Sequence, residues 1–527
     1  MRTRLTLLAA VLACGTTAYA KPLTVCTEAS PEGFDVVRYN SLTTTNASAD
    51  VLFNRLVDYD ARAGKLVPSL ASSWQVAADG QSITFSLRPG VGFHKTAWFK
   101  PSRPLNADDV VFSFQRMLDP THPWYKSAPT GYPHAKSFQL DKLIKAVVKV
   151  DARTVRFELN QPDATLLPLL SMGFASIYSA EYAEQLAKAG NFDQLNSLPV
   201  GTGPFVFQSL AKDSAVRYAA NPAYFGGKPP AERLIYAITP DSAVRAQKLK
   251  AGECQIALSP KPQDINDVAG DARVKVLSTP MFSTAFVALN SQHKPFDDKR
   301  VRQAVNLAFD KANYLKVVFV GSAVAANNPF PPSTFGYNKA VKDYPQDLAR
   351  AKKLLADAGY GNGFDTSIWV RPTGSTLNPN PKAGAEVLQA DLAKIGIRAE
   401  IKVLEWGELI KRGKAGEHDL LFMGWAGDNG DADNFLTPQF SCAAVQSGTN
   451  FARYCDPALD KLITDARHVA NPKLRAANYA RAQQLIKEQA LWLPLAHPTA
   501  ATLTSSTVSG YQVSPFGRVD FSKAVVK

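Results

Sequence analysis

Short segments of alternating apolar and polar residues recur along the chain and predict β-strands. Residues 22–27 form an apolar run that ends in a turn. Residues 66–94 predict a hairpin, because Ile83, Phe85 and Leu87 alternate with polar residues and Asp79-Gly80 supplies a tight turn. The same alternation recurs around Phe157, and further strands are predicted at 366–371, 399–404 and 420–425.

Apolar residues at helical spacing alternate with these strands. Residues 298–318, 347–359 and 471–490 carry this spacing, and Asn106 is placed to cap a helix that begins after it. Alternation of strands and helices in both halves of the chain predicts an α/β fold. A length of 527 residues predicts at least two domains, and an apolar fraction of 46% is ample for their cores.

The first twenty residues read as a secretory signal peptide. Arg2 and Arg4 precede a nine-residue apolar stretch, and Ala18-Tyr19-Ala20 offers a cleavage site after Ala20. The stretch is too short to span a bilayer, so we expect cleavage and a periplasmic mature protein. The alternative is a lipid-anchored form through Cys14, although Leu12 fits a lipoprotein signal poorly.

The mature chain is basic without having a basic tract. Removal of residues 1–20 takes away two Arg and lowers the formal net charge from +13 to +11. Basic pairs such as Lys299-Arg300 lie beside acids or on the outer face of a predicted helix, so we expect no nucleic-acid partner and no membrane span.

Four cysteines remain after cleavage, which in an exported chain predicts disulfides. Cys442 and Cys455 enclose a short polar loop and are expected to pair, which leaves Cys26 with Cys254. With no Cys-x-x-Cys motif and no nearby His pair, we expect no metal site.

A Cys26–Cys254 bond would place the start of the chain beside residues near 250, with an insertion between them. We therefore expect two lobes and an extra inserted domain. The predicted parts are domain I (21–54, 203–280 and 499–527), an inserted α/β subdomain (55–202) and domain II (281–498).

Catalytic motifs are missing from the sequence. There is no Gly-x-Ser-x-Gly, Walker loop or His-Glu-x-x-His, and the seven His residues are scattered. Ser209 and Lys212 match Ser-x-x-Lys without the motifs that accompany it in hydrolases. We expect a protein that is not an enzyme and has no cofactor, with a serine hydrolase as the remote alternative.

An acidic segment follows the strand predicted at 420–425. Its acids do not fit a calcium loop, because Gly430 or Phe435 falls where a ligand is required. One interpretation is a turn with helix-capping Asp and Asn residues. The other is a binding loop, in which Asp428 meets a ligand ammonium and Trp425 covers apolar ligand surface.

The chain resembles periplasmic dipeptide-binding proteins of peptide ABC transporters, in the peptide/nickel class of family 5 solute-binding proteins. The resemblance extends over nearly the whole mature chain and is clearest in Gly201-Thr202-Gly203-Pro204-Phe205 and Gly427-Asp428-Asn429-Gly430. The other matching segments are residues 26–34, 70–74, 79–80, 87–90, 105–114, 238–241, 301–304 and 405–408.

This resemblance implies a type II periplasmic-binding-protein fold whose two lobes close on a peptide, with the same two disulfides. It implies that Asp428 pairs with the peptide ammonium and that Trp425 lines a pocket. It also implies that Gly427 and the turn at Ala29 and Ser30 contact the ligand backbone.

One position departs from the family pattern. Such binders place an Arg before an Asn-Pro-Asn segment to hold the ligand carboxylate, whereas here Ser375 precedes Asn378-Pro379-Asn380 and Leu377 replaces an aromatic residue. A hydroxyl cannot replace a bidentate guanidinium. Arg371 is either its substitute or a solvent-exposed residue at a strand end.

The expected function is capture of di- or oligopeptides by a monomeric, exported receptor that delivers them to an ABC permease. Because of Ser375, the alternative is the same fold with a non-peptide solute such as haem, a metal chelate or an opine.

Overall fold

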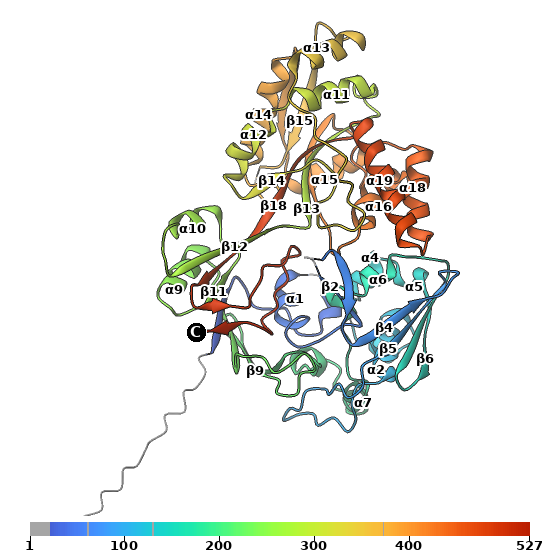
Figure 1. Cartoon of the computed structure of the whole chain (residues 1–527), viewed down its shortest axis with the longest axis vertical. Helices are drawn as coiled ribbons and strands as arrows, with labels where there is room; N and C mark the ends of the chain where they lie inside the picture. Colours follow the sequence, from blue (N-terminus) through green and yellow to red (C-terminus); the bar gives the residue numbers. More distant parts are fainter. Residues whose placement is uncertain (1–21, 40, 61–62, 129–130, 373) are drawn as a thin grey trace, which may run out of the picture.

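The computed structural model describes residues 22–39, 41–60, 63–128, 131–372 and 374–527. The predicted signal peptide and Cys14 lie outside these residues. Figure 1 shows two lobes, with an additional group of strands and helices beside the lobe that holds the C-terminus. This is the predicted α/β architecture of two lobes with an inserted part.

Lobe I is built on a mixed sheet in which β1 pairs in parallel with β10 and β11, and β9 joins β10 to β8. The apolar run at 22–27 forms β1, as predicted. The strands are β1 (Leu23–Thr27), β8 (Phe205–Ala211), β9 (Ala215–Ala220), β10 (Arg233–Ile238), β11 (Ile256–Leu258) and β12 (Val274–Pro280), with helices α1 (Leu42–Ser48), α9 (Ser242–Lys250) and α10 (Pro262–Asp267).

Lobe II has a central sheet with helices on both faces. Strand β13 is buried along its whole length, with Val287 in one apolar cluster and Phe286 in another on the opposite face. The strands are β13 (Ser283–Leu289), β14 (Ala323–Ala325), β15 (Phe364–Val370), β16 (Ile397–Val403) and β17 (Leu420–Ala426). The helices are α11 (Lys299–Ala308), α12 (Lys311–Tyr314), the π-helix η3 (Leu315–Phe319), α13 (Leu348–Asp357), α14 (Pro381–Ala393), α15 (Trp406–Ala415), α16 (Asp433–Phe440), α17 (Cys442–Ser447), α18 (Pro457–His468) and α19 (Pro472–Glu488).

A long strand, β18 (Trp492–Ser505), runs from lobe II into lobe I (Figure 1). Its first half pairs with β13 and its second half with β11 and β12. The lobes are thus joined by two antiparallel segments, residues 280–282 and 497–499, where the Met281 N–H donates to the Pro498 carbonyl at 2.7 Å.

The inserted subdomain holds a hairpin and a four-stranded antiparallel sheet in the order β4-β5-β7-β6. Its side chains share one continuous core with lobe I. The strands are β2 (Val57–Asp60), β3 (Lys65–Pro68), β4 (Ala71–Val76), β5 (Ser82–Leu87), β6 (Ile144–Asp151) and β7 (Thr154–Leu159), and the longer helices are α2 (Ala107–Leu118) and α7 (Ala180–Lys188). We propose the same division into domains as above, on the strength of these separate sheets.

Local predictions agree with the structure at several points. The hairpin forms from β4 and β5 with Gly80 at positive φ, and Asn106 caps α2 by accepting from the Asp108 N–H at 2.9 Å. The predicted helix at 298–318 is wrong in its continuity. It ends at Ala308, and Asp310 caps a new short helix by accepting from the Asn313 N–H at 3.0 Å.

Both predicted disulfides are present. Cys26 in β1 pairs with Cys254, with their Cα atoms 5.9 Å apart, and Cys442 pairs with Cys455 at 4.7 Å. The first bond ties the start of lobe I to a residue 228 positions later, and the second closes a short loop in lobe II.

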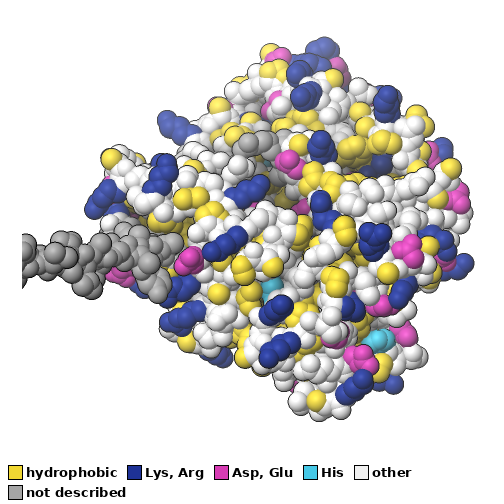
Figure 2. Space-filling view, turned by 60° about the horizontal axis from the view of Figure 1, so that its bottom comes forward, with side chains coloured by type: hydrophobic (Ala, Val, Ile, Leu, Met, Phe, Trp, Pro, Cys, Tyr) yellow, Lys and Arg dark blue, Asp and Glu magenta, His cyan; other side chains and the backbone are white. Residues whose placement is uncertain are grey.

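The surface matches the dispersed charge pattern of the sequence. On the face in Figure 2, Lys and Arg side chains are spread over the surface, singly and in small groups, rather than gathered into one patch. Within the described ranges, no helix combines the length and apolar character needed to cross a bilayer.

Candidate functional site

The acidic loop, residues 427–434, leaves the end of β17 where the two lobes meet. Its first N–H, from Gly427, donates to the carbonyl of Phe282 in the segment that joins the lobes, at 2.8 Å. A Cβ at Gly427 would lie 2.5 Å from the Phe282 ring and 2.7 Å from the Phe435 ring. A glycine at this position therefore allows the loop to pack tightly against the joining segment.

Two of the three acids in this loop have side-chain partners inside lobe II. Asp431 is buried and receives two hydrogen bonds from the guanidinium of Arg475. Asp433 accepts from the hydroxyl of Thr437 at 2.6 Å, and Arg467 lies 3.9 Å from its carboxylate. These two carboxylates have partners and serve to fix the loop.

The third acid, Asp428, has no such partner. Its backbone N–H donates to Oδ1 of Asn434 at 2.9 Å, which holds the main chain. Among the described residues, no side chain makes a hydrogen bond or ion pair with its carboxylate. Water reaches the exposed side chain, yet the surrounding protein desolvates it enough to raise the pKa of Asp428 to about 6.

Trp425 is the penultimate residue of β17 and is half-buried. Its indole N–H donates to the carbonyl of Asn434 at 2.7 Å. Asn434 therefore fixes both the ring of Trp425 and the backbone of Asp428, which share one end of the loop.

Ser375 lies in a tight turn that the structure places over β17. Its N–H and carbonyl bond to the carbonyl and N–H of Asn378 at 2.9 and 3.0 Å, and its hydroxyl also accepts from that N–H at 3.2 Å. Leu377 at the tip of this turn packs against Gly424, where a Cβ would lie 2.8 Å from the Leu377 side chain. The turn thus contacts the strand residue directly before Trp425.

Arg371 follows β15 and is half-buried. Its guanidinium carbon lies 4.7 Å from the ring centroid of Trp406, the first residue of α15. The contact is a cation–π interaction that holds the arginine against lobe II.

Ala29 and Ser30 lie in the turn after β1, on lobe I. Ala29 is exposed, and the Ser30 hydroxyl accepts from the Asp213 N–H at 2.7 Å. Strand β1 is parallel to its two neighbours, and ligands in open α/β sheets bind beyond the carboxyl ends of such strands. Among the described residues, no hydrogen bond or ion pair connects this turn with Asp428.

An aromatic cluster beside the acidic loop was not predicted. Phe516, from the C-terminal segment, has its ring 5.0 Å from that of Phe282 and 5.7 Å from that of Tyr59. The Tyr59 hydroxyl lies 3.2 Å from the Gly430 carbonyl, on the same loop. These residues are far apart in sequence and belong to no motif, so only the fold reveals the cluster.

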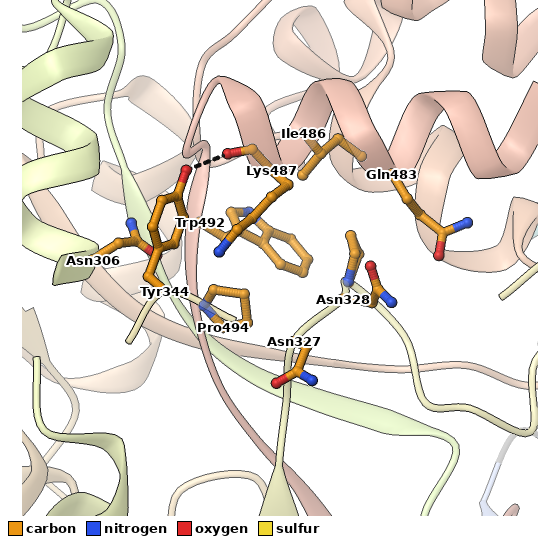
Figure 3. Close-up of a pocket in the computed structure, with 10 residues that line it drawn as sticks. Asn306, Asn327, Asn328, Tyr344, Gln483, Ile486, Lys487, Trp492 and Pro494 are labelled. Carbon is orange, nitrogen blue, oxygen red and sulfur yellow. Dashed lines mark hydrogen bonds between the residues drawn. The ribbon is translucent and has the colours of Figure 1, made fainter. Parts of the chain in front are cut away.

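A small pocket inside lobe II does not suit an organic ligand. Figure 3 shows Lys487, Tyr344 and Trp492 among the side chains that surround it. Its volume is about 10 Å³, which is room for about one water molecule. Nζ of Lys487 lies 2.9 Å from the Tyr344 ring centroid, and burial lowers the pKa of this lysine to about 7.

The remaining chemical candidates stay isolated. Ser209 and Lys212 are exposed at the end of β8, and Ser209 faces Arg217 of β9 in the strand register. In the part of the chain that the structure describes, no three His, Cys, Asp or Glu side chains are grouped as metal ligands.

Residues 65–447 match the family described as bacterial extracellular solute-binding proteins, family 5. The chain belongs to this family. The predicted resemblance is therefore confirmed, and the family is one of binding proteins rather than of enzymes.

Individual relatives extend the similarity to nearly the whole chain. A probable di/tripeptide-binding protein 5 of Pseudomonas aeruginosa is 64% identical to this solute-binding protein over 97% of the chain and 96% of the relative. Among solved structures, HbpA2 from Haemophilus parasuis matches with 39% identity and a TM-score of 0.92, over 96% of this chain and 99% of that one. A dipeptide-binding protein from Pseudoalteromonas sp. SM9913, in complex with Met-Leu, matches with 35% identity and a TM-score of 0.75, over 96% and 100% of the two chains.

Proposed function

We propose that this solute-binding protein is a receptor for short peptides that serves an ABC importer. The observation that carries the proposal is the Asp428 carboxylate, which lies on a loop where the lobes meet and is the one acid of that loop without an internal partner. A desolvated carboxylate is stabilised by a cation, and every unmodified peptide has an ammonium group at its N-terminus. The peptide ligands named for the relatives support the same ligand class.

The peptide would lie between Asp428 of lobe II and the turn at Ala29 and Ser30 of lobe I. Trp425, fixed by Asn434, would cover the first side chain. Gly427 would offer its carbonyl to the peptide backbone, since its N–H is already bonded to Phe282. Backbone hydrogen bonds of this kind recognise a peptide without reading its side chains.

The far end of the peptide would meet the Ser375 turn rather than an arginine. A Ser hydroxyl makes one neutral hydrogen bond where a guanidinium makes two charged ones. Arg371 is held over Trp406 and would approach the peptide carboxylate only from the α15 side of lobe II. We therefore propose that recognition of the C-terminus is weak and that peptides longer than two residues are accepted.

Binding would draw the lobes together about the joining segments 280–282 and 497–499, since a ligand buried between lobes needs a moving part for its entry. We further propose export through cleavage after Ala20, a monomeric state and delivery to a permease in the inner membrane.

Isothermal titration calorimetry tests the ligand class. The mature protein should bind Met-Leu, a tripeptide extended at its C-terminus and the C-terminal amide of Met-Leu with affinities within about tenfold of one another. N-acetyl-Met-Leu should bind far more weakly. Equal affinity for the free and acetylated peptides would contradict the proposal, as would a non-peptide solute, such as haem, in native mass spectra of protein purified from its own periplasm.

A further inference from the structure

A second cavity lies between the inserted subdomain and lobe II, and it borders the acidic loop at Gly430 and Asp431 without including Asp428. Its volume is about 410 Å³, within the usual range for small-molecule pockets. Strands β2 to β5 and the loop before α6 (Leu166–Leu169) line it from the subdomain, and the ends of α18 and α19 line it from lobe II.

The subdomain wall of this cavity is apolar and only partly covered. Trp74 and Val76 of β4, Leu66 of β3 and Leu167 line it, and all four side chains retain exposed surface, 36% in the case of Val76. Alternate residues of a strand face the same side, so Trp74 and Val76 lie on one face of β4 and Gln75 on the other. Such a wall fits the body of an apolar or aromatic molecule.

Among the described residues that line the cavity, the acids have ion-pair partners and one lysine does not. The two acids that line it are already paired, Asp163 with Arg467 at 3.1 Å and Asp431 with Arg475. Lys65 also lines the cavity, is exposed and forms no ion pair among the described residues. Lys65 thus offers the cavity a positive charge without an ion-pair partner, and an anionic group on the occupant would supply one.

The cavity does not include the proposed peptide site. Gly430 and Asp431 line it, whereas Asp428 does not. Tyr59 packs directly on Gly430 at this end, where a Cβ would lie 1.8 Å from the tyrosine ring.

We propose that this cavity is a second ligand site, for an amphipathic organic anion with an apolar or aromatic body and one carboxylate or sulfonate group. Trp74 and Val76 contact the body, and Lys65 pairs with the anionic group. Because the occupant touches both the subdomain and lobe II, its binding is coupled to the relative position of these two parts.

The probe for this site is 8-anilino-1-naphthalenesulfonate, whose fluorescence rises in apolar surroundings. The mature protein should bind it with one-to-one stoichiometry. Val76→Arg, which fills the cavity from an exposed position, should weaken binding at least tenfold. Gln75→Arg, which places the same charge on the opposite face of the same strand, is the matched control and should leave affinity within twofold.

Lys65→Gln should weaken binding several-fold and reduce its dependence on salt, which a purely apolar contact would not show. Asp428→Asn should leave probe affinity unchanged, so failure of the peptide proposal and failure of this one are distinguishable. Equal loss in Val76→Arg and Gln75→Arg overturns the proposal. So does a crystal structure of the complex in which the probe occupies another place, including the vicinity of Asp428. Equal melting temperatures of the variants show that their folds are intact.

Discussion

Replacement of Asp428 by Asn tests the proposed peptide site most directly, because it removes one charge and keeps the shape of the side chain. Loss of one partner of a charged pair in an interface typically costs about 2–5 kcal/mol. The Asp428 side chain is exposed, and screening by water places the cost near the lower end, about 2–3 kcal/mol. The dissociation constant for Met-Leu should therefore rise roughly 30- to 150-fold at neutral pH.

The pH dependence gives a second signature of the same carboxylate. Its pKa is about 6 without ligand, and an ammonium partner stabilises the ionised form and lowers the pKa in the complex. Below pH 6 the free protein must lose a proton in order to bind. As the pH falls below 6, the dissociation constant of the unaltered protein should then rise about tenfold per pH unit, whereas that of Asp428→Asn should not change over the same range.

Calorimetry of a double-mutant cycle separates this pairing from other effects. The four titrations combine the unaltered protein and Asp428→Asn with Met-Leu and N-acetyl-Met-Leu. If the two groups interact, their losses should not add, because either change alone removes the pair. Asp297→Asn, which alters an exposed carboxylate of the same lobe, is the control and should change nothing. Additive losses, or an Asp428→Asn affinity within twofold of the unaltered protein, would refute the reasoning.

Three further changes have expected outcomes. Burial lowers the pKa of three histidines to about 4, so between pH 6.5 and pH 4 the unfolded chain binds more protons than the folded one. As the pH falls through this window, denaturant titrations should show the free energy of unfolding decreasing by up to about 4 kcal/mol per pH unit. These residues are His94, His418 and His497. Burial lowers the pKa of Lys487 to about 7, and each tenfold loss of proton affinity on folding costs about 1.4 kcal/mol. Lys487→Met should therefore raise the free energy of unfolding at pH 7 and remove the increase of stability between pH 7 and pH 10. A variant less stable than its parent would contradict this. Gly427→Ala should displace the loop from the ring of Phe282 and weaken Met-Leu binding about tenfold, as measured by calorimetry, with an unchanged affinity as the contrary result.

Local elements could be predicted because their causes are local. The β4–β5 hairpin and the capped start of α2 follow from alternation, an Asp-Gly turn and an Asn at the right position. The break after Ala308 shows the limit of periodicity. Apolar spacing continues past it, but the Asp310 carboxylate accepts from the Asn313 N–H and begins a new helix.

Local sequence patterns could not predict how the two lobes are joined. Strand β18 begins with an apolar run, Trp492–Ala496, and its second half mixes Thr with Ala and Leu. Nothing in this sequence indicates that its two halves pair with strands of different lobes. The position of Phe516 beside Tyr59 depends on the same long-range arrangement. Long-range pairing places these contacts, so residue patterns within one segment cannot supply them.

The acidic loop shows why composition indicates a site without identifying its working residue. Three acids in six residues have the same formal charge, and the motif alone does not say which of them has a partner. Helices α18 and α19 decide this, because Arg467 and Arg475 reach back to Asp433 and Asp431 from more than thirty positions later. Asp428 differs from the other two acids because no arginine of those helices reaches its carboxylate. A charge left without a partner at the meeting of two lobes is the feature that a cationic ligand group recognises, and the fold creates it by giving partners to the other two acids.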